Sequence, residues 1–293
     1  MTTPPIQWYP GHIAKAEKAL KEQLKRVDVV LEVRDARIPL ATHHPQVAEW
    51  VGSKARVLVL NRVDMILPQA QQVWTKWFKA QGEYLYFTNA QDGKGVASVA
   101  QAAQKAGVEI NQRRRDRGML PRPVRAVVIG FPNVGKSALI NRLLSRRVVE
   151  SAARPGVTRQ LRWIRISDQL ELLDAPGVIP AKLDNQTDAL KLAICDDIGD
   201  GAYDNQRVAA ALIDLIKQLE ASSADLLPKN PLQFRYGLDP TPVTGEDYLH
   251  ALAQRRNQGD VERTARQLLT DFRKGLLGAT LLELPPLSKK PTW

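Results

Sequence analysis

The first 180 residues alternate between short apolar runs and longer amphipathic stretches. Six apolar runs read as candidate strands, at 27–33, 56–60, 83–87, 124–129, 161–166 and 169–174. The segments between the first three are long enough for crossover helices, such as residues 68–80. Such alternation is typical of parallel βαβ units. We therefore predict a doubly wound, mostly parallel sheet of roughly six strands.

Helical periodicity dominates outside these runs. Residues 13–27 carry an apolar stripe on one face, which predicts an N-terminal helix. After about residue 183 the strand pattern stops, and apolar positions recur at helix spacing over 261–272. We therefore expect an α/β domain over residues 1–183, including the N-terminal helix, followed by a small all-α domain over residues 184–293.

Three polar positions or segments punctuate this pattern. Asp260 precedes the last periodic stretch and is a candidate helix cap, and Thr244 with Asp247 marks a second helix start. The arginine-rich segment 111–123 lies between two apolar patterns, and we expect it to be a connector.

Composition narrows the class of protein. The 42 Lys and Arg residues against 31 Asp and Glu give a net charge of +11, which attracts polyanions. The one cysteine, Cys195, excludes an intramolecular disulfide, and we expect it to be a packed core residue. No apolar run approaches the roughly 18 residues that span a bilayer, and the first residues do not resemble a secretory signal. We expect a cytoplasmic protein without a membrane association.

The strongest motif is a GxxxxGKS loop at 130–137, between the candidate strand 124–129 and a helix that starts near Lys136. Glycines let backbone N–H groups surround phosphate oxygens, Lys136 adds a positive charge, and Ser137 offers a hydroxyl to Mg²⁺. The nucleotide-binding residues predicted here are Asn133, Val134, Gly135, Lys136, Ser137 and Ala138. This loop indicates a P-loop nucleoside triphosphatase.

Two further segments indicate guanine. Asn61-Arg62-Val63-Asp64 resembles the NKxD motif of GTPases, with Arg62 in place of the lysine. An ionised Asp64 can accept hydrogen bonds from the guanine N1–H and amino group, which adenine does not offer together. Asn89 and Ala90 follow the next strand, where GTPases carry a base-supporting loop. We therefore predict GTP and GDP as ligands.

The switch elements follow the phosphate loop. Asp174-Ala-Pro-Gly177 matches DxxG, in which the carboxylate holds Mg²⁺ through water and the Gly177 amide senses the γ-phosphate. Thr158 stands between the two motifs, so we predict that Ser137, Thr158 and Asp174 hold Mg²⁺. Because the guanine motif precedes the phosphate loop, the G domain is circularly permuted. The helical domain then follows the switch, and we expect it to report the nucleotide state.

The chain resembles the YlqF/RbgA family of ribosome-biogenesis GTPases over nearly its whole length. The resemblance rests on WYPGHIAKA at 8–16, VRDARIPL at 33–40, GFPNVGKSALINRL from 130, RPGVT, LLDAPG and RYGLDP at 235–240. It implies late assembly of the large ribosomal subunit, a GTPase cycle stimulated by that particle, and a C-terminal RNA-binding domain. We expect a monomer that contacts ribosomal RNA.

The resemblance also raises questions of catalysis. Val178 follows Gly177, so the glutamine that positions water in Ras-like enzymes is absent. In the family the histidine of the PGH segment is the candidate replacement, which points to His12. An ordered N-terminal turn or an RNA contact is the alternative for His12. Asn133 resembles the asparagine that coordinates K⁺ in potassium-stimulated GTPases.

Arginines gather around the connector and switches, and again on the C-terminal helices, which favours contact with RNA phosphates. His43, His44 and His250 indicate only surface or loop positions. Three alternatives stay open. The protein could act chiefly as an RNA-binding assembly factor with negligible hydrolysis of its own. It could be a small-subunit type of permuted GTPase, which the single cysteine disfavours, or an ATPase, which Asp64 disfavours.

Overall fold

The computed structural model describes residues 6, 18, 20–144, 162–174, 183, 185–199 and 203–286. These residues form two compact units. The sheet unit contains the described residues of Tyr9–Val63 and Thr75–Ala181, and the helical unit contains those of Asp64–Trp74 and Lys182–Pro285 together with Ile6. Among the described residues, none of the helices combines the length and apolar character needed to cross a bilayer.

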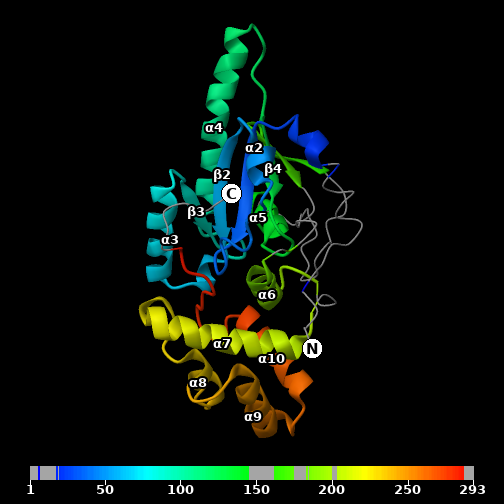
Figure 1. The fold of residues 1–293 in the computed structure, drawn as a ribbon. Helices are drawn as coiled ribbons and strands as arrows, with labels where there is room; N and C mark the ends of the chain where they lie inside the picture. Colours follow the sequence, from blue (N-terminus) through cyan, green and yellow to red (C-terminus); the bar gives the residue numbers. More distant parts are fainter. Residues whose placement is uncertain are drawn as a thin grey trace. The chain divides into compact units, whose positions relative to one another are not determined.

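The sheet has the predicted architecture (Figure 1). Its strands are β1 (Val29–Asp35), β2 (Ala55–Asn61), β3 (Leu85–Thr88), β4 (Val124–Ile129), β5 (Arg162–Ser167) and β6 (Leu170–Asp174). They lie in the order β3-β2-β1-β4-β6-β5, and every neighbouring pair is parallel except β5 with β6. β4, which leads into the glycine loop, is therefore central although it is fourth in the chain. This order confirms the permuted α/β fold.

Helices connect the strands. They are α2 (Val47–Val51), η1 (Val63–Met65), α3 (Pro68–Ala80), α4 (Val96–Asp116) and α5 (Lys136–Leu143). α3 has the predicted bounds. The predicted connector 111–123 is wrong in its first part, because α4 continues to Asp116. Arginine and glutamine are good helix formers, and the helix stops only where Gly118 adopts a left-handed φ of 70°.

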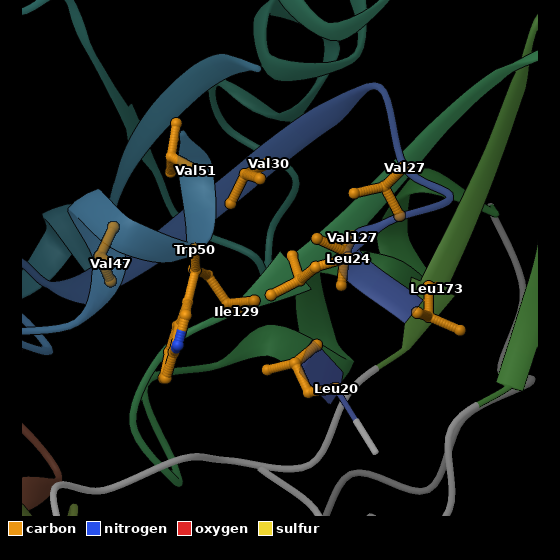
Figure 2. Packing of buried hydrophobic residues seen from close by; sticks show 10 residues of the cluster. All are labelled: Leu20, Leu24, Val27, Val30, Val47, Trp50, Val51, Val127, Ile129 and Leu173. Carbon is orange, nitrogen blue, oxygen red and sulfur yellow. The ribbon is translucent and has the colours of Figure 1, made fainter. Parts of the chain in front are cut away.

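The core of the sheet unit lies on both faces of the central strands. Figure 2 shows one of its clusters, made of Leu20, Leu24, Val27, Val30, Val47, Trp50, Val51, Val127, Ile129 and Leu173. The helical residues 20–24 and α2 supply the cover, while β1, β4 and β6 supply the sheet side of this cluster. α4 packs on the opposite face, where a Cβ on Gly107 would lie 1.8 Å from Cγ2 of Val124. Glycine is needed there for the close approach of helix and strand.

A buried charged network lies on the α2 face of β1. Glu32 and Arg34 are both almost fully buried, and Arg34 Nε donates to Glu32 Oε1 at 2.7 Å. Arg56 from β2 donates to the other carboxylate oxygen at 3.2 Å. Burial alone would raise the pKa of Glu32, but the Arg34 guanidinium holds it well below its usual range. The carboxylate therefore stays ionised inside the unit.

His43 completes this network. Its Nδ1 lies 2.6 Å from Arg34 Nη2 and 2.9 Å from Glu32 Oε1. A guanidinium only donates and an ionised carboxylate only accepts, so Nδ1 accepts from Arg34 in one tautomer of the neutral ring and donates to Glu32 in the other. Burial and the Arg34 charge lower the pKa of His43, against the attraction of Glu32. His43 and His44 do lie in a loop, but their side chains are buried rather than on the surface, whereas His250 is exposed.

We predict that His43 makes the protein less stable as the pH falls. A folded-state pKa below the unfolded value of about 6.5 means that the folded state binds fewer protons, so stability decreases as pH falls through this range. His43→Gln keeps an acceptor for Arg34 but does not titrate. Its urea midpoint should change less between pH 7 and pH 5 than that of the wild type.

The exposed His250→Gln is the matched control for losing one imidazole. If the urea midpoint of His43→Gln changed with pH as much as that of the wild type, His43 would not cause the pH dependence. The same would follow if His250→Gln reduced the pH dependence as much as His43→Gln does.

The helical unit contains α6 (Gln186–Cys195), α7 (Asn205–Ser223), η3 (Ala224–Leu226), α8 (Pro231–Tyr236), α9 (Gly245–Asn257) and α10 (Val261–Arg273). Both predicted start signals are confirmed. The Thr244 side chain accepts from Asp247 N at the start of α9, and the Asp260 side chain accepts from Arg263 N at the start of α10. Cys195, at the end of α6, is buried as expected.

Arg273 ties α10 to the end of α6. Its guanidinium donates to the carbonyl of Ala193 at 2.8 Å, to that of Ile194 at 3.0 Å, and to the Tyr203 hydroxyl at 2.9 Å. The Ala193 carbonyl also accepts from Asp196 N at 3.2 Å, but helix C-terminal carbonyls such as that of Ile194 lack partners within their own helix, so the Arg273 bonds satisfy a group that would otherwise be costly to bury.

We expect Arg273→Met, which keeps most of the apolar stem, to lower the free energy of unfolding by about 1–3 kcal/mol. Arg266→Met is the control on the same helix, because Arg266 is exposed and pairs only across one turn with Glu262 at 2.7 Å. Its loss should be roughly 0.5 kcal/mol or less. Urea unfolding followed by circular dichroism compares them. Equal losses would show that the Arg273 bonds do not stabilise α6.

Candidate nucleotide-binding site

The loop between β4 and α5 has the backbone of a phosphate-binding loop. Gly130 has φ 148°, and a Cβ there would lie 2.2 Å from the Val33 carbonyl oxygen. Gly135 has φ 99°, and a Cβ there would lie 2.1 Å from Nδ2 of Asn61. Both positions combine a positive φ with close neighbours, so they require glycine. Asn133, with φ 56°, is of the residue type that tolerates the left-handed region.

Lys136 is the first residue of α5, and its ammonium is held inside this loop. Nζ donates to the carbonyl oxygens of Phe131 at 2.7 Å and Gly130 at 3.2 Å, and the side chain is buried. Gly135 is the N-cap of α5 and contributes no side-chain cap. The first turn of the helix thus presents backbone N–H groups beside a fixed positive charge, an arrangement that suits a phosphate. Ser137 and Ala138 are in that turn.

Asn61, at the end of β2, joins three segments through one buried amide. Its Nδ2 donates to the Val134 carbonyl in the phosphate loop at 2.9 Å. Its Oδ1 accepts from the Thr88 hydroxyl and from the Ala90 backbone N–H, each at 3.0 Å. The structure therefore brings together the predicted residues Asn61, Ala90 and Val134, although they are up to 73 positions apart in the chain.

Arg62 explains how arginine serves where GTPases carry lysine. It has a left-handed φ of 63°, and its Nη2 donates to the Asn133 carbonyl in the phosphate loop at 2.6 Å. Its Nη1 lies 3.2 Å from Asp35 Oδ2 at the end of β1. The forked guanidinium thus spans two partners, which a single ammonium reaches less readily.

Asp35 is a site residue that the sequence pattern did not reveal. Arg37 also holds it, with Nη2 and Nε donating to the two carboxylate oxygens at 2.7 and 3.0 Å. Burial opposes ionisation of Asp35, but Arg37 and Arg62 keep its pKa lowered. Its position after a buried central strand, at the carboxyl edge of the sheet, is the signal that could have found it.

The remaining predicted base-binding residues lie on short loops. Asn89 is a half-buried residue that forms an isolated antiparallel bridge with Lys94, and its Oδ1 accepts from Gln91 N at 3.0 Å. The Ala90 carbonyl accepts from Arg142 Nε of α5 at 3.4 Å, which links this loop to α5 in addition to its link through Asn61 to the phosphate loop. Asp64 is exposed in η1, three positions after Asn61 in the chain.

Part of the predicted site lies outside the described residues. His12, Thr158 and Gly177 are among these, as is the side chain of Asp174. The backbone of Asp174 closes β6 and lies in register with Val128 of β4. The DxxG segment therefore starts from the strand beside the one that leads into the phosphate loop.

We predict that Asn61→Ala weakens GDP binding by about 10- to 100-fold, because it leaves the buried Ala90 N–H and Val134 carbonyl without their partner and loosens two loops at once. Titration with a fluorescent GDP analogue measures the affinity.

Thr88→Val is the graded control. It removes only the hydroxyl, and Asn61 Oδ1 still accepts from Ala90 N. We expect a loss of about fivefold or less. Equal losses in the two variants would show that Asn61 does not act by joining the loops.

Comparisons with known proteins agree with this geometry. A family model described as 50S ribosome-binding GTPase matches residues 125–229. Ribosome biogenesis GTPase A of Priestia megaterium is 35% identical, with 98% of this chain and 99% of that protein covered. The Bacillus cereus protein of the same name is 34% identical over 96% of this chain and 94% of its own length.

A solved structure shares the fold. The GNP-bound structure of YlqF from Thermotoga maritima has a TM-score of 0.62 and 22% identity, and covers 92% of this chain and 98% of that one. That likeness concerns the fold, while the identities with the two bacterial relatives establish descent. The chain belongs to the ribosome biogenesis GTPase A family, also called YlqF/RbgA, as its permuted order of motifs predicts.

Proposed function

We propose that this protein is a switch that binds and hydrolyses GTP during late assembly of the large ribosomal subunit, in contact with ribosomal RNA. The observation that carries the proposal is the Asn61 amide, which joins the phosphate loop to the two loops expected to hold guanine. These three segments form one site although their chain order is permuted. The names of the relatives, ribosome biogenesis GTPase A, give the process.

The phosphates of GTP lie against the loop 130–137. Lys136 is buried and bonded to two loop carbonyls, so its charge is held inside the loop. The N–H groups at the start of α5 supply further donors for oxygens. Pre-organised donors of this kind cost no reorganisation during the reaction.

Guanine is recognised by Asp64, and Asn61 and Ala90 belong to the same proposed nucleotide-binding set. Two charge-assisted hydrogen bonds to Asp64 favour guanine over adenine. Arg62 and Asn89 belong to the proposed nucleotide-binding residues, and Arg62 also holds its loop in place. Arg62 does so through its bonds to Asp35 and to the phosphate loop.

The residues fit a Mg²⁺ ion bound with the nucleotide. Ser137 lies in the first turn of α5 and offers a hydroxyl oxygen, the hard donor that Mg²⁺ prefers. Thr158 and Asp174 complete the proposed donor set, and Gly177 senses the γ-phosphate. The ion would neutralise developing charge on the phosphates. Asn133 in the same loop is the proposed K⁺ ligand.

Hydrolysis needs a group that orients water, because Val178 stands after Gly177 and has no polar side chain. We assign that role to His12. An imidazole in hydrogen-bond reach of the water can hold it in line with the γ-phosphate and accept its proton. We propose that binding to the ribosomal particle positions His12 and the water for this step.

The C-terminal part, residues 184–293, is the proposed RNA-binding domain. It follows Gly177 directly in the chain, so a change in the contact between Gly177 and γ-phosphate would be transmitted to it. The net charge of +11 supports an RNA partner for the chain as a whole, but residues 184–293 themselves carry 13 Lys and Arg against 16 Asp and Glu, so the positive excess lies in residues 1–183. We propose a cytoplasmic monomer.

The test is GTP hydrolysis by wild type and by His12→Ala, each with and without purified large ribosomal subunits, in potassium buffer. General acid–base groups contribute about 10²- to 10⁴-fold. We therefore expect subunits to accelerate wild type and to leave His12→Ala at least about 100-fold slower, with unchanged GDP affinity. His250→Ala, which removes an exposed imidazole of the helical unit, is the matched control.

Each outcome separates the alternatives. Equal acceleration of wild type and His12→Ala would remove His12 from the machinery. No acceleration of wild type would instead favour an RNA-binding assembly factor with negligible hydrolysis.

Repeating the assay in sodium buffer tests the proposed K⁺ ligand Asn133, because the wild-type rate of GTP hydrolysis is expected to be slower there.

A further inference from the structure

The C-terminal part of α4 extends beyond the sheet that it covers. α4 has 21 residues and is about 32 Å long at 1.5 Å per residue, whereas the six residues of β4 span about 20 Å. Its fully buried residues are Val96, Val99, Ala103 and Gly107. Residues 108–123 are all exposed or half-buried. Figure 1 shows the helix continuing past the strands, with the chain returning beside it. We call residues 108–123 the arginine prong.

Hydrogen bonds build the prong into a defined hairpin. The helix ends in a Schellman motif, in which Gly118 N donates to the Arg115 carbonyl at 2.8 Å and Met119 N to the Arg114 carbonyl at 2.9 Å. Asn111 is bonded twice to the returning chain, through Nδ2 to the Arg122 carbonyl at 2.9 Å and through Oδ1 to Arg122 N at 3.1 Å. The returning segment is therefore fixed against the helix.

Further bonds anchor both ends of that segment. Near the tip, Arg114 Nε donates to the Leu120 carbonyl at 3.0 Å. At the base, the Arg122 guanidinium donates to both carboxylate oxygens of Asp28, at 2.6 and 2.8 Å. Pro121 and Pro123 restrict the backbone between them. The prong thus holds its shape without being covered by the rest of the sheet unit.

The surface of the prong combines positive charge with an apolar tip. Arg113, Arg115 and Arg117 are exposed, against the two acidic groups Glu109 and Asp116. Leu120 is 84% exposed at the tip, and Met119 beside it is 41% exposed. Arginines in a last helical turn also favour the helix dipole. That effect explains neither the exposed leucine nor the bonds that hold the returning chain.

We propose that the arginine prong is an RNA-docking element. Its arginines lie along the phosphates of a structured RNA, and Leu120 packs against an unstacked base or ribose at a loop or bulge. RNA is favoured because its charge complements the arginines, while its unpaired bases offer apolar faces to a rigid tip. This inference rests on the proposed function, because it takes RNA as the partner. It adds an RNA contact on the sheet unit to the one proposed for residues 184–293.

The test compares Arg113→Gln/Arg115→Gln/Arg117→Gln with Arg26→Gln/Lys76→Gln/Lys79→Gln. Both triple variants remove three exposed charges of the same chain, and Arg114 and Arg122 stay because they build the hairpin. The probe is naked large-subunit ribosomal RNA, titrated between 50 and 200 mM KCl. Large-subunit particles are titrated in parallel.

We expect the prong variant to bind about 10- to 30-fold more weakly at low salt, with a salt slope smaller by roughly 2 to 3, as for three lost phosphate contacts. The control variant should change less than threefold. Leu120→Ser should weaken binding by about fivefold or more at an unchanged slope, because it removes an apolar contact and no charge. Circular dichroism checks that each variant is folded.

Equal affinities of the prong and control variants for naked RNA would overturn the proposal, and so would a failure of the wild type to bind that RNA. If the prong variant lost binding to subunits but kept it to naked RNA, the partner would be a ribosomal protein, which also overturns it. Basal GTP hydrolysis and GDP affinity are measured on the same samples. If the wild type neither hydrolysed GTP nor bound GDP, the proposed switch would be refuted. If a prong variant changed only RNA binding, the result would bear on the prong proposal alone.

Discussion

The site depends on one side-chain amide, that of Asn61. Its Nδ2 donates to the Val134 carbonyl, and its Oδ1 accepts from the Thr88 hydroxyl and the Ala90 N–H. These bonds fix the distance between the phosphate loop and the loop that contains Ala90. A side-chain amide carries its donor and its acceptor on two different atoms, so it can bond two loops that lie in different directions. A carboxylate would repel the Val134 carbonyl, and an apolar side chain would leave three buried polar groups without partners. The glycine at 135 follows from the same constraint, because Asn61 occupies the space of its Cβ.

Circular permutation keeps the bonds of Asn61 possible, because it changes the order of the strands along the chain and not their places in the sheet. β2, which ends in Asn61, and β4, which leads into the phosphate loop, lie on either side of β1. β1 contributes Asp35 at the same edge, and Arg62 bridges from Asp35 to the phosphate loop. The carboxyl ends of three parallel strands therefore converge on one site, as expected for a doubly wound sheet. The covalent connections can be exchanged so long as these ends keep their places.

The sequence reveals the strands, the caps and the glycine loop, because each rests on interactions between neighbours in the chain. Asp260 and Thr244 cap helices through bonds three residues away, which a local pattern contains. Asp35 was missed because its importance comes from Arg62, which joins the site only after β1 and β2 pair. The loop position of His43 was predicted, but its place in the network was missed for the same reason, since nothing near it in the chain shows that it contacts Arg34 and Glu32. The end of α4 was placed too early because arginine-rich composition does not distinguish an exposed helix from a loop.

That exposed helix is also where the permuted chain makes its new connection. The segment from α4 to β4 joins two elements that need only a short link, since α4 already lies on β4 at Gly107 and Val124. Connections in compact domains usually take a few residues. Here the chain instead continues outward for more than two helical turns and returns through an irregular segment that is hydrogen-bonded to the helix. Backbone ordering costs roughly 1–2 kcal/mol per residue, and this segment buries little apolar surface to offset that cost. Stability therefore does not explain the arginine prong, and this is the reason for proposing a partner that contacts it.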